Sequence, residues 1–154
     1  MFKKIEYTKY SPSKPVLIWD GDCGFCKFWK TRWQEKTEGK VDFETYQEKA
    51  SDFPDIPLKE FKKASRLIES DGKVYSGPDS AYRSLWHADR KTYHEWYKKY
   101  DWFESISDYG YNHIAKNRHF YFQVTKLFFG DDPLKLKPYW LIYLLIIFSI
   151  IFII

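Results

Sequence analysis

Hydrophobic and polar positions in the first part of the chain follow strand-like and then helix-like patterns. Residues 16–19 are a run of four apolar residues after a proline, as expected of a central strand that is covered on both faces. In residues 23–36, aromatic side chains recur at every fourth position, with basic residues between them: Phe25, Trp29 and Trp33. This spacing predicts an amphipathic helix directly after the strand.

Shorter elements are expected next. Gly39 can end the helix, because glycine adopts the left-handed conformation at little cost. Val41 and Phe43 alternate with acidic residues, as in a half-buried strand. Residues 47–57 contain two prolines and are interpreted as a loop, and residues 58–63 are predicted to form one short helix.

A hairpin and another helix complete this region. Residues 65–68 and 73–75 flank Asp71 and Gly72, a pair that favours a tight turn between antiparallel strands. Asp79 is interpreted as the N-cap of the helix that follows. The predicted order, βαβ(α)ββα with a pair of cysteines after the first strand, is the thioredoxin-like plan, and the fold class is therefore α/β. Residues 92–129 are rich in aromatic side chains and are predicted to add two or three packed helices.

The C-terminal segment differs in kind. Residues 138–154 contain no charged side chain and follow two lysines, and aromatic residues gather at the lysine end of the segment. A helix of this length reaches about 25 Å, and the flanking lysines and aromatics are typical of a cytoplasmic membrane interface. We therefore predict a single transmembrane helix with the preceding domain on the cytoplasmic side. The alternatives are a buried core element, or one span of a longer membrane protein.

These patterns divide the chain into four parts. Residues 1–14 are expected to be a flexible lead-in without a signal peptide, and residues 15–130 to form the thioredoxin-like domain. Residues 131–137 are expected to link that domain to the membrane segment, residues 138–154.

Composition limits the classes of function that fit the chain. The formal net charge is only +4, with acidic and basic residues interleaved, so the chain has no footprint for nucleic-acid binding. Aromatic residues make up 21% of the chain, which allows one domain to bury a large apolar area. The only two cysteines lie three positions apart, which suits a redox pair or half of a metal site rather than the disulfide framework of a secreted protein.

The cysteine pair carries the predicted chemistry. Cys23 and Cys26, one helical turn apart, can form a disulfide, and the positive end of the helix dipole favours a thiolate. Because Cys23 would lie at the exposed end, we expect it to attack a substrate disulfide, and Cys26 to resolve the mixed disulfide.

Neighbouring residues are expected to adjust this chemistry. Gly24 leaves room for a substrate sulfur to approach. Asp20 and Asp22 would raise the pKa of a nearby thiol, because their negative charges oppose formation of a thiolate. Asp20 could also exchange a proton with Cys26, or it could only cap the turn.

Other functions fit the same residues less completely. A zinc site would need two more ligands from His87, His94, His113 and His119, which are distant in sequence and not spaced like a zinc motif. The D-x-D string after an apolar strand also resembles the start of magnesium-dependent phosphatases of the haloacid-dehalogenase type, but that interpretation leaves the cysteines unexplained. The domain could also be a docking module without catalysis. No bound cofactor is expected.

The string DGDCGFC after an apolar strand resembles the DCC family of thiol-disulfide oxidoreductases, which is named for its D-x-x-C-x-x-C motif. Here that motif is Asp20, Cys23 and Cys26. Two further strings, LIESDGKVYSGPDSAYRSL and HIAKNRHFYF, are similar to later parts of the family, so the resemblance covers roughly residues 15–130. It implies a thiol or disulfide substrate, either a protein or a small molecule.

The resemblance also suggests two supporting residues. Arg118 matches a late Asn-Arg pair of the family and could hold Asp20 or a substrate carboxylate. Thioredoxin relatives usually carry a cis-proline before the third strand, where its backbone pairs with the substrate chain. Ser65 stands at that place here, which favours a small thiol, a membrane partner or a specialised protein as substrate.

Overall fold

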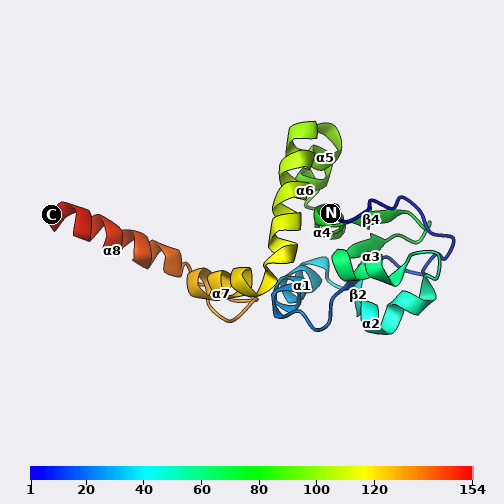
Figure 1. The fold of residues 1–154 in the computed structure, drawn as a ribbon, viewed down its shortest axis with the longest axis horizontal. Coiled ribbons are helices and arrows are strands. Elements are labelled where there is room, and N and C mark those ends of the chain that lie inside the picture. Colours follow the sequence, from blue (N-terminus) through cyan, green and yellow to red (C-terminus); the bar gives the residue numbers. More distant parts are fainter. Residues whose placement is uncertain (154) are drawn as a thin grey trace.

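The computed structural model describes residues 1–153 and contains a small mixed sheet surrounded by helices (Figure 1). The strands are β1 (Val16–Trp19), β2 (Asp42–Thr45), β3 (Arg66–Ile68) and β4 (Val74–Ser76). The helices are α1 (Gly24–Thr37), α2 (Tyr46–Lys49), the 3₁₀ turn η1 (Ala50–Asp52), α3 (Leu58–Lys63), α4 (Pro78–His87), α5 (Thr92–Lys99), α6 (Asp101–Lys116), α7 (Arg118–Phe129) and α8 (Tyr139–Ile153).

The sheet has the strand order β2-β1-β3-β4. β1 pairs with β2 in parallel, through the α1 crossover, and with β3 in antiparallel orientation. β3 and β4 form the predicted antiparallel hairpin. This arrangement confirms the mixed α/β class and is consistent with the thioredoxin-like plan.

The two faces of the sheet are covered by different apolar clusters, because successive side chains of a strand point to opposite faces. Ile18 packs on one face and Leu17 on the other, and both are fully buried. Phe53, Ile56 and Phe61 cover the first face from the segment that connects β2 with β3. An apolar run with no polar position, as in β1, therefore marks the centre of the sheet.

The helix α1 packs differently from the prediction. Phe28 is its buried aromatic residue, whereas Phe25 and Trp29 stay partly exposed. The reason is that α1 contacts both α4 and α7 as well as the sheet, so no single stripe of its surface is the buried one. The helix ends at Glu38 and Gly39, which both have positive φ.

Two local predictions were wrong. The segment 47–57 contains helical structure, since α2 and η1 cover residues 46–52. Asp79 is not an N-cap: α4 begins one residue earlier, after Gly77 in a positive-φ conformation. The sequence did not predict α2 and η1, because two prolines nearby are typical of a loop.

The first residues pack onto the domain rather than preceding it. Glu6 and Thr8 exchange backbone hydrogen bonds with the β4 hairpin, at Val74 and Gly72. Phe2 is 6% exposed, and its ring fills the space beside Gly77 where a Cβ would stand. The segment 1–14, expected to be a flexible lead-in, thus extends the open edge of the sheet.

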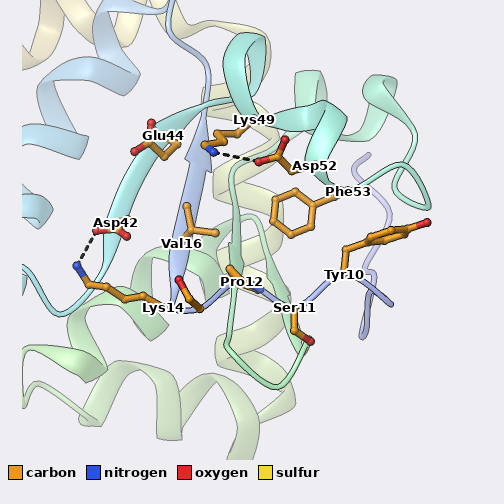
Figure 2. A pocket seen from close by; sticks show the side chains of 11 residues that line it. Tyr10, Ser11, Pro12, Lys14, Val16, Asp42, Glu44, Lys49, Asp52 and Phe53 are labelled. Carbon is orange, nitrogen blue, oxygen red and sulfur yellow. Dashed lines mark hydrogen bonds and ion pairs between the residues drawn. The ribbon is translucent and has the colours of Figure 1, made fainter.

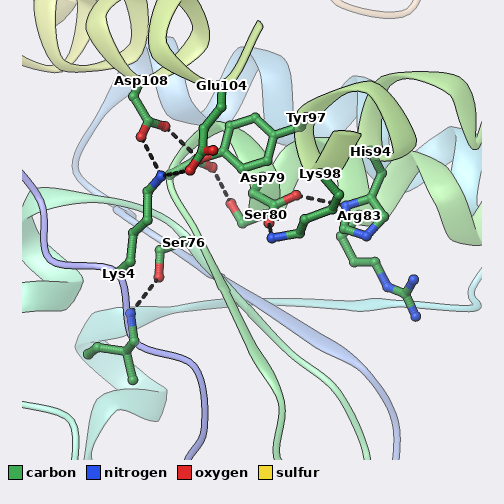
Figure 3. A network of polar contacts seen from close by, with 12 residues as sticks. Lys4, Ser76, Asp79, Ser80, Arg83, His94, Tyr97, Lys98, Glu104 and Asp108 are labelled. Carbon is green, nitrogen blue, oxygen red and sulfur yellow. Dashed lines mark hydrogen bonds and ion pairs between the residues drawn. The ribbon is translucent and has the colours of Figure 1, made fainter. Parts of the chain in front are cut away.

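Polar contacts fix the α5–α6 pair to the sheet domain (Figure 3). The buried Asp79 on α4 binds His94 Nδ1 at 2.7 Å and Lys98 Nζ at 2.5 Å, both from α5. Asp108 on α6 accepts a hydrogen bond from Tyr97 Oη at 2.6 Å and pairs with Lys4. Burial and this bond to Asp108 both raise the pKa of Tyr97, so its hydroxyl stays protonated. These contacts hold α5 and α6 against α4.

Residues 139–153 of the predicted membrane segment form α8, which projects away from the domain (Figure 1). The helix contacts α7, where Phe128 packs against Tyr143. The helix has 15 residues, or about 22 Å at about 1.5 Å per residue. Within residues 1–153, no helix is both long and apolar enough to cross a membrane. The prediction of a spanning helix is thus not supported, because the helix is shorter than the hydrocarbon core of about 30 Å. The segment's last residue, Ile154, lies outside the described residues.

Candidate active site

The cysteines lie at the junction of β1 and α1, as predicted. Cys23 is the N-cap of α1, and its Sγ accepts a hydrogen bond from the Cys26 amide at 3.1 Å. The two side chains form a disulfide across a Cα–Cα distance of 5.1 Å. No acidic residue lies in the first turn of α1, so the positive end of its dipole acts directly on Cys23.

Asp20 is held by an arginine that lies 98 positions later in the chain. Arg118 Nη1, at the start of α7, is 2.7 Å from Asp20 Oδ2. The backbone carbonyl of Asp20 accepts a hydrogen bond from the Cys23 amide at 3.2 Å, which makes the tight turn into the cysteine motif. The structure therefore brings Asp20, Cys23 and Arg118 together, and the arginine offsets the negative charge beside the dithiol.

Gln47 also stabilises the turn into the cysteine motif, and the sequence did not predict this role. Its amide donates to Asp20 at 3.2 Å and to Asp22 at 3.1 Å, and its carbonyl accepts from the Gly21 amide at 3.1 Å. Gln47 lies on α2, in the segment interpreted as a loop, and nothing in its sequence context marks it. Desolvation, together with the charges of Asp20 and Asp22, raises the pKa of the neighbouring Tyr46.

Gly24 has a packing role. A Cβ at this position would lie 2.9 Å from the ring of Phe122 on α7. Because glycine stands here, α7 can approach the first turn of α1 closely, and Arg118 on the same helix reaches Asp20. The open space predicted for a substrate sulfur is thus partly taken by an aromatic ring.

Ser65 lies directly before β3 and is bonded to α6. The Ser65 amide donates to Tyr111 Oη at 3.0 Å, and the Ser65 carbonyl accepts from the Gly77 amide at 2.9 Å. The Ser65 hydroxyl lies 2.8 Å from Ser80 Oγ and 3.2 Å from Tyr111 Oη. A small cavity of about 60 Å³ joins this cluster to Asp20, Cys26 and Arg118. Tyr111 therefore belongs to the site, although its aromatic context in the sequence suggested only packing.

A larger groove of about 580 Å³ opens beside the dithiol. Helices α1, α4, α6 and α7 line it, mostly with apolar side chains, and Cys26, Tyr111 and Arg118 line it too. A separate hollow of about 450 Å³ lies between the N-terminal segment and β2 (Figure 2). Its charged groups are partly paired as Lys14–Asp42 and Lys49–Asp52, and neither cysteine lines it.

The described part of the chain contains no arrangement of side chains that matches a metal site. No group of three or more His, Cys, Asp or Glu side chains there could hold a metal ion. The two cysteine sulfurs are bonded to each other, Asp20 and Asp22 are bonded to Arg118 and Gln47, and His94 is bonded to Asp79.

A disulfide between a strand end and a helix N-terminus, in a mixed sheet of this order, is the arrangement of a thiol-disulfide domain and is consistent with the thioredoxin-like plan. The model of the DCC1-like thiol-disulfide oxidoreductase family matches residues 17–124, well over half of the chain, so this chain belongs to that family. The match confirms the resemblance seen in the D-x-x-C-x-x-C motif. No curated protein and no solved structure matches the chain.

Proposed function

We propose that the protein exchanges thiols and disulfides through Cys23 and Cys26. The single observation that carries this proposal is their disulfide at the N-terminus of α1, the position where a helix dipole lowers a thiol pKa. Family membership supports the reaction class, since members are thiol-disulfide oxidoreductases. The direction of electron flow depends on the partner's potential.

In the reducing direction, the Cys23 thiolate attacks a substrate disulfide. One substrate sulfur leaves as a thiolate, and the other stays bonded to Cys23. Cys26 then loses its proton and attacks Cys23 Sγ, which releases the second substrate thiol and leaves the disulfide seen in the structure. Two electrons pass from the dithiol to the substrate, and the reverse sequence oxidises a substrate dithiol.

Asp20 is proposed to accept the Cys26 proton during the second step. Its carboxylate and Cys26 line the same small cavity, where the ion pair with Arg118 orients the carboxylate. A carboxylate in such a position can move a proton between the buried thiol and solvent. Asp22 is exposed and bonded to Gln47, so its part is to support the turn.

The full chain in mild detergent is equilibrated across redox buffers, alkylated and weighed as intact protein. The expected result is one reversible two-electron transition within roughly −120 to −270 mV, the range of catalytic dithiols. Cys23→Ser should abolish exchange. Cys26→Ser should accumulate a mixed disulfide on Cys23. A pair that stays reduced in every buffer contradicts the proposal.

The apolar helix α8 supports a second part of the proposal, attachment of residues 138–154 to a membrane with the catalytic domain on the cytoplasmic side. Its apolar side chains, among them Leu145 and Phe148, are exposed around the helix, and Lys135 and Lys137 precede it. Flotation of the full chain with lipid vesicles tests this attachment, and Leu145→Asp/Phe148→Asp should release the protein. Unchanged flotation of that variant, or none of the parent chain, contradicts it. Protease protection in closed inside-out and right-side-out vesicles reports the side of the domain.

A further inference from the structure

The groove beside Cys26 suggests which substrates reach the dithiol. Its volume of about 580 Å³ falls within the range of about 300–1,000 Å³ that is typical of small-molecule sites. Helices α1, α4, α6 and α7 contribute the lining, which is mostly apolar and includes Phe25, Trp29, Trp33, Phe103, Ile106 and Ile114. Arg118 is its one charged lining residue among those described, and Asp20 already pairs with it at 2.7 Å. A neutral, apolar occupant suits such a surface, because no charge in it needs a partner.

The backbone beside the dithiol argues against an extended peptide as the occupant. Ser65 lies directly before β3 and lines the same small cavity as Cys26. Its amide already donates to Tyr111 Oη, and its carbonyl already accepts from the Gly77 amide. A substrate chain that adds to a strand needs free backbone donors and acceptors, and Ser65 has no free N–H to donate.

We propose that the groove binds small, neutral disulfides or thiols with an apolar body and delivers their sulfur to the dithiol. This inference rests on the function proposed above and specifies its substrate class. For a disulfide substrate, the dithiol loses two electrons and two protons and becomes the disulfide, while the substrate leaves as two thiols. The thiol substrates follow the reverse path.

Gly110 provides a direct test, because it lines the groove from the middle of α6 and a Cβ there would meet nothing within 4 Å. Gly110→Phe should place a ring in the groove, because its Cβ meets no atom within 4 Å, and Gly110→Ala is the matched control. Both changes replace a glycine inside a helix. Glycine has the lowest helix propensity of all residues except proline, so neither change should weaken the fold. A thermal melt checks this expectation.

Reduced full-length protein is mixed with 4,4′-dithiodipyridine, an apolar aromatic disulfide, or with bis(2-hydroxyethyl) disulfide, a small polar one. The rate of each variant is compared with the rate of the parent protein for the same compound, so the difference in intrinsic reactivity between the two disulfides cancels. Gly110→Phe should lower the ratio of the apolar to the polar rate about tenfold, which corresponds to about 1.4 kcal/mol. Gly110→Ala should keep that ratio within about twofold, as expected for one added methyl group that contacts no other atom.

A second pair of variants keeps the test independent of position 110. Ile106→Asp introduces a carboxylate at the rim of the groove and should lower the same ratio. Tyr109→Asp, on the same helix but exposed outside the groove, should leave both rates at the parent value. A ratio that neither Gly110→Phe nor Ile106→Asp changes would overturn the substrate assignment while the exchange activity stands. If Gly110→Phe slowed the reaction with an extended peptide disulfide as much as it slowed the reaction with the apolar disulfide, that result would also overturn it. Failure of the parent protein to react with either disulfide would instead refute the proposed function.

Discussion

Replacement of Arg118 by methionine should raise the thiol pKa of the reduced Cys23–Cys26 pair. Arg118 Nη1 lies 2.7 Å from Asp20 Oδ2, and both residues line the cavity that contains Cys26. Without the guanidinium, an uncompensated carboxylate faces the dithiol, and a negative charge disfavours a nearby thiolate. Methionine keeps most of the aliphatic length, so the packing of α7 on α1 should be preserved.

The size of the effect follows from the exposure of the pair. A charge close to a titrating group shifts its pKa by about 1–3 units. Here the side chains of Arg118 and Asp20 are 22% and 20% exposed, so solvent screens them partly and the lower end applies. We expect an increase of about one unit, which equals about 1.4 kcal/mol. The cost in folding stability should stay near 1 kcal/mol, as for other partly exposed ion pairs.

Thiolate absorbance in the ultraviolet, followed against pH in the reduced protein, measures the thiol pKa directly. A matched set isolates the charge effect: Asp20→Asn alone should lower the pKa, and Asp20→Asn/Arg118→Met should return it to near the parent value. An unchanged pKa in Arg118→Met, or a double variant that behaves like the single one, would refute the electrostatic reasoning.

Three further predictions concern stability, and urea unfolding measures each of them. Phe2→Ala should cost about 3 kcal/mol, as for other buried phenylalanines, since Phe2 is 6% exposed beside Gly77; a neutral result would show that the first residues are not packed. Arg66→Met should cost about 3 kcal/mol, because it leaves the buried Glu60 with only one of its two cationic partners, and a stabilised variant would contradict this. Burial opposes ionisation of Glu69, but its bonds to His87 and Arg83 at 2.8 and 2.6 Å outweigh burial and lower the Glu69 pKa. Its stabilisation is therefore complete above the unfolded pKa of about 4.3 and is lost as pH falls through the lower folded value, so Glu69→Gln should flatten the acid loss of stability; an unaltered slope would contradict this.

The strands and the reactive pair could be predicted because their signals are local. β1 is a run of four apolar residues, the hairpin contains Asp71 and Gly72, and the cysteines follow the first strand directly. Local patterns determine such elements before any tertiary contact is known. The family match over residues 17–124 agrees with the motif for the same reason.

The support around the dithiol could not be predicted, because it depends on contacts between distant segments. Gln47 lies 27 positions from Asp20, and Tyr111 lies 46 positions from Ser65. Neither residue has a periodicity or a motif that marks it as part of the site. The pairing of Arg118 with Asp20 was considered only through the family resemblance. The spanning helix predicted for residues 138–154 is not supported, since α8 has 15 residues and is shorter than a hydrocarbon core of about 30 Å.

The helices after the sheet domain determine what can reach the dithiol. In the βαβ(α)ββα core alone, the Ser65 amide would be free to pair with a substrate chain. Tyr111 on α6 takes that amide, Phe122 on α7 covers Gly24, and Arg118 on α7 neutralises Asp20. The same two helices line the apolar groove that ends at Cys26. Selectivity for substrates should therefore change with substitutions on α6 and α7, whereas the reactivity of the thiols should change with Asp20 and its partners.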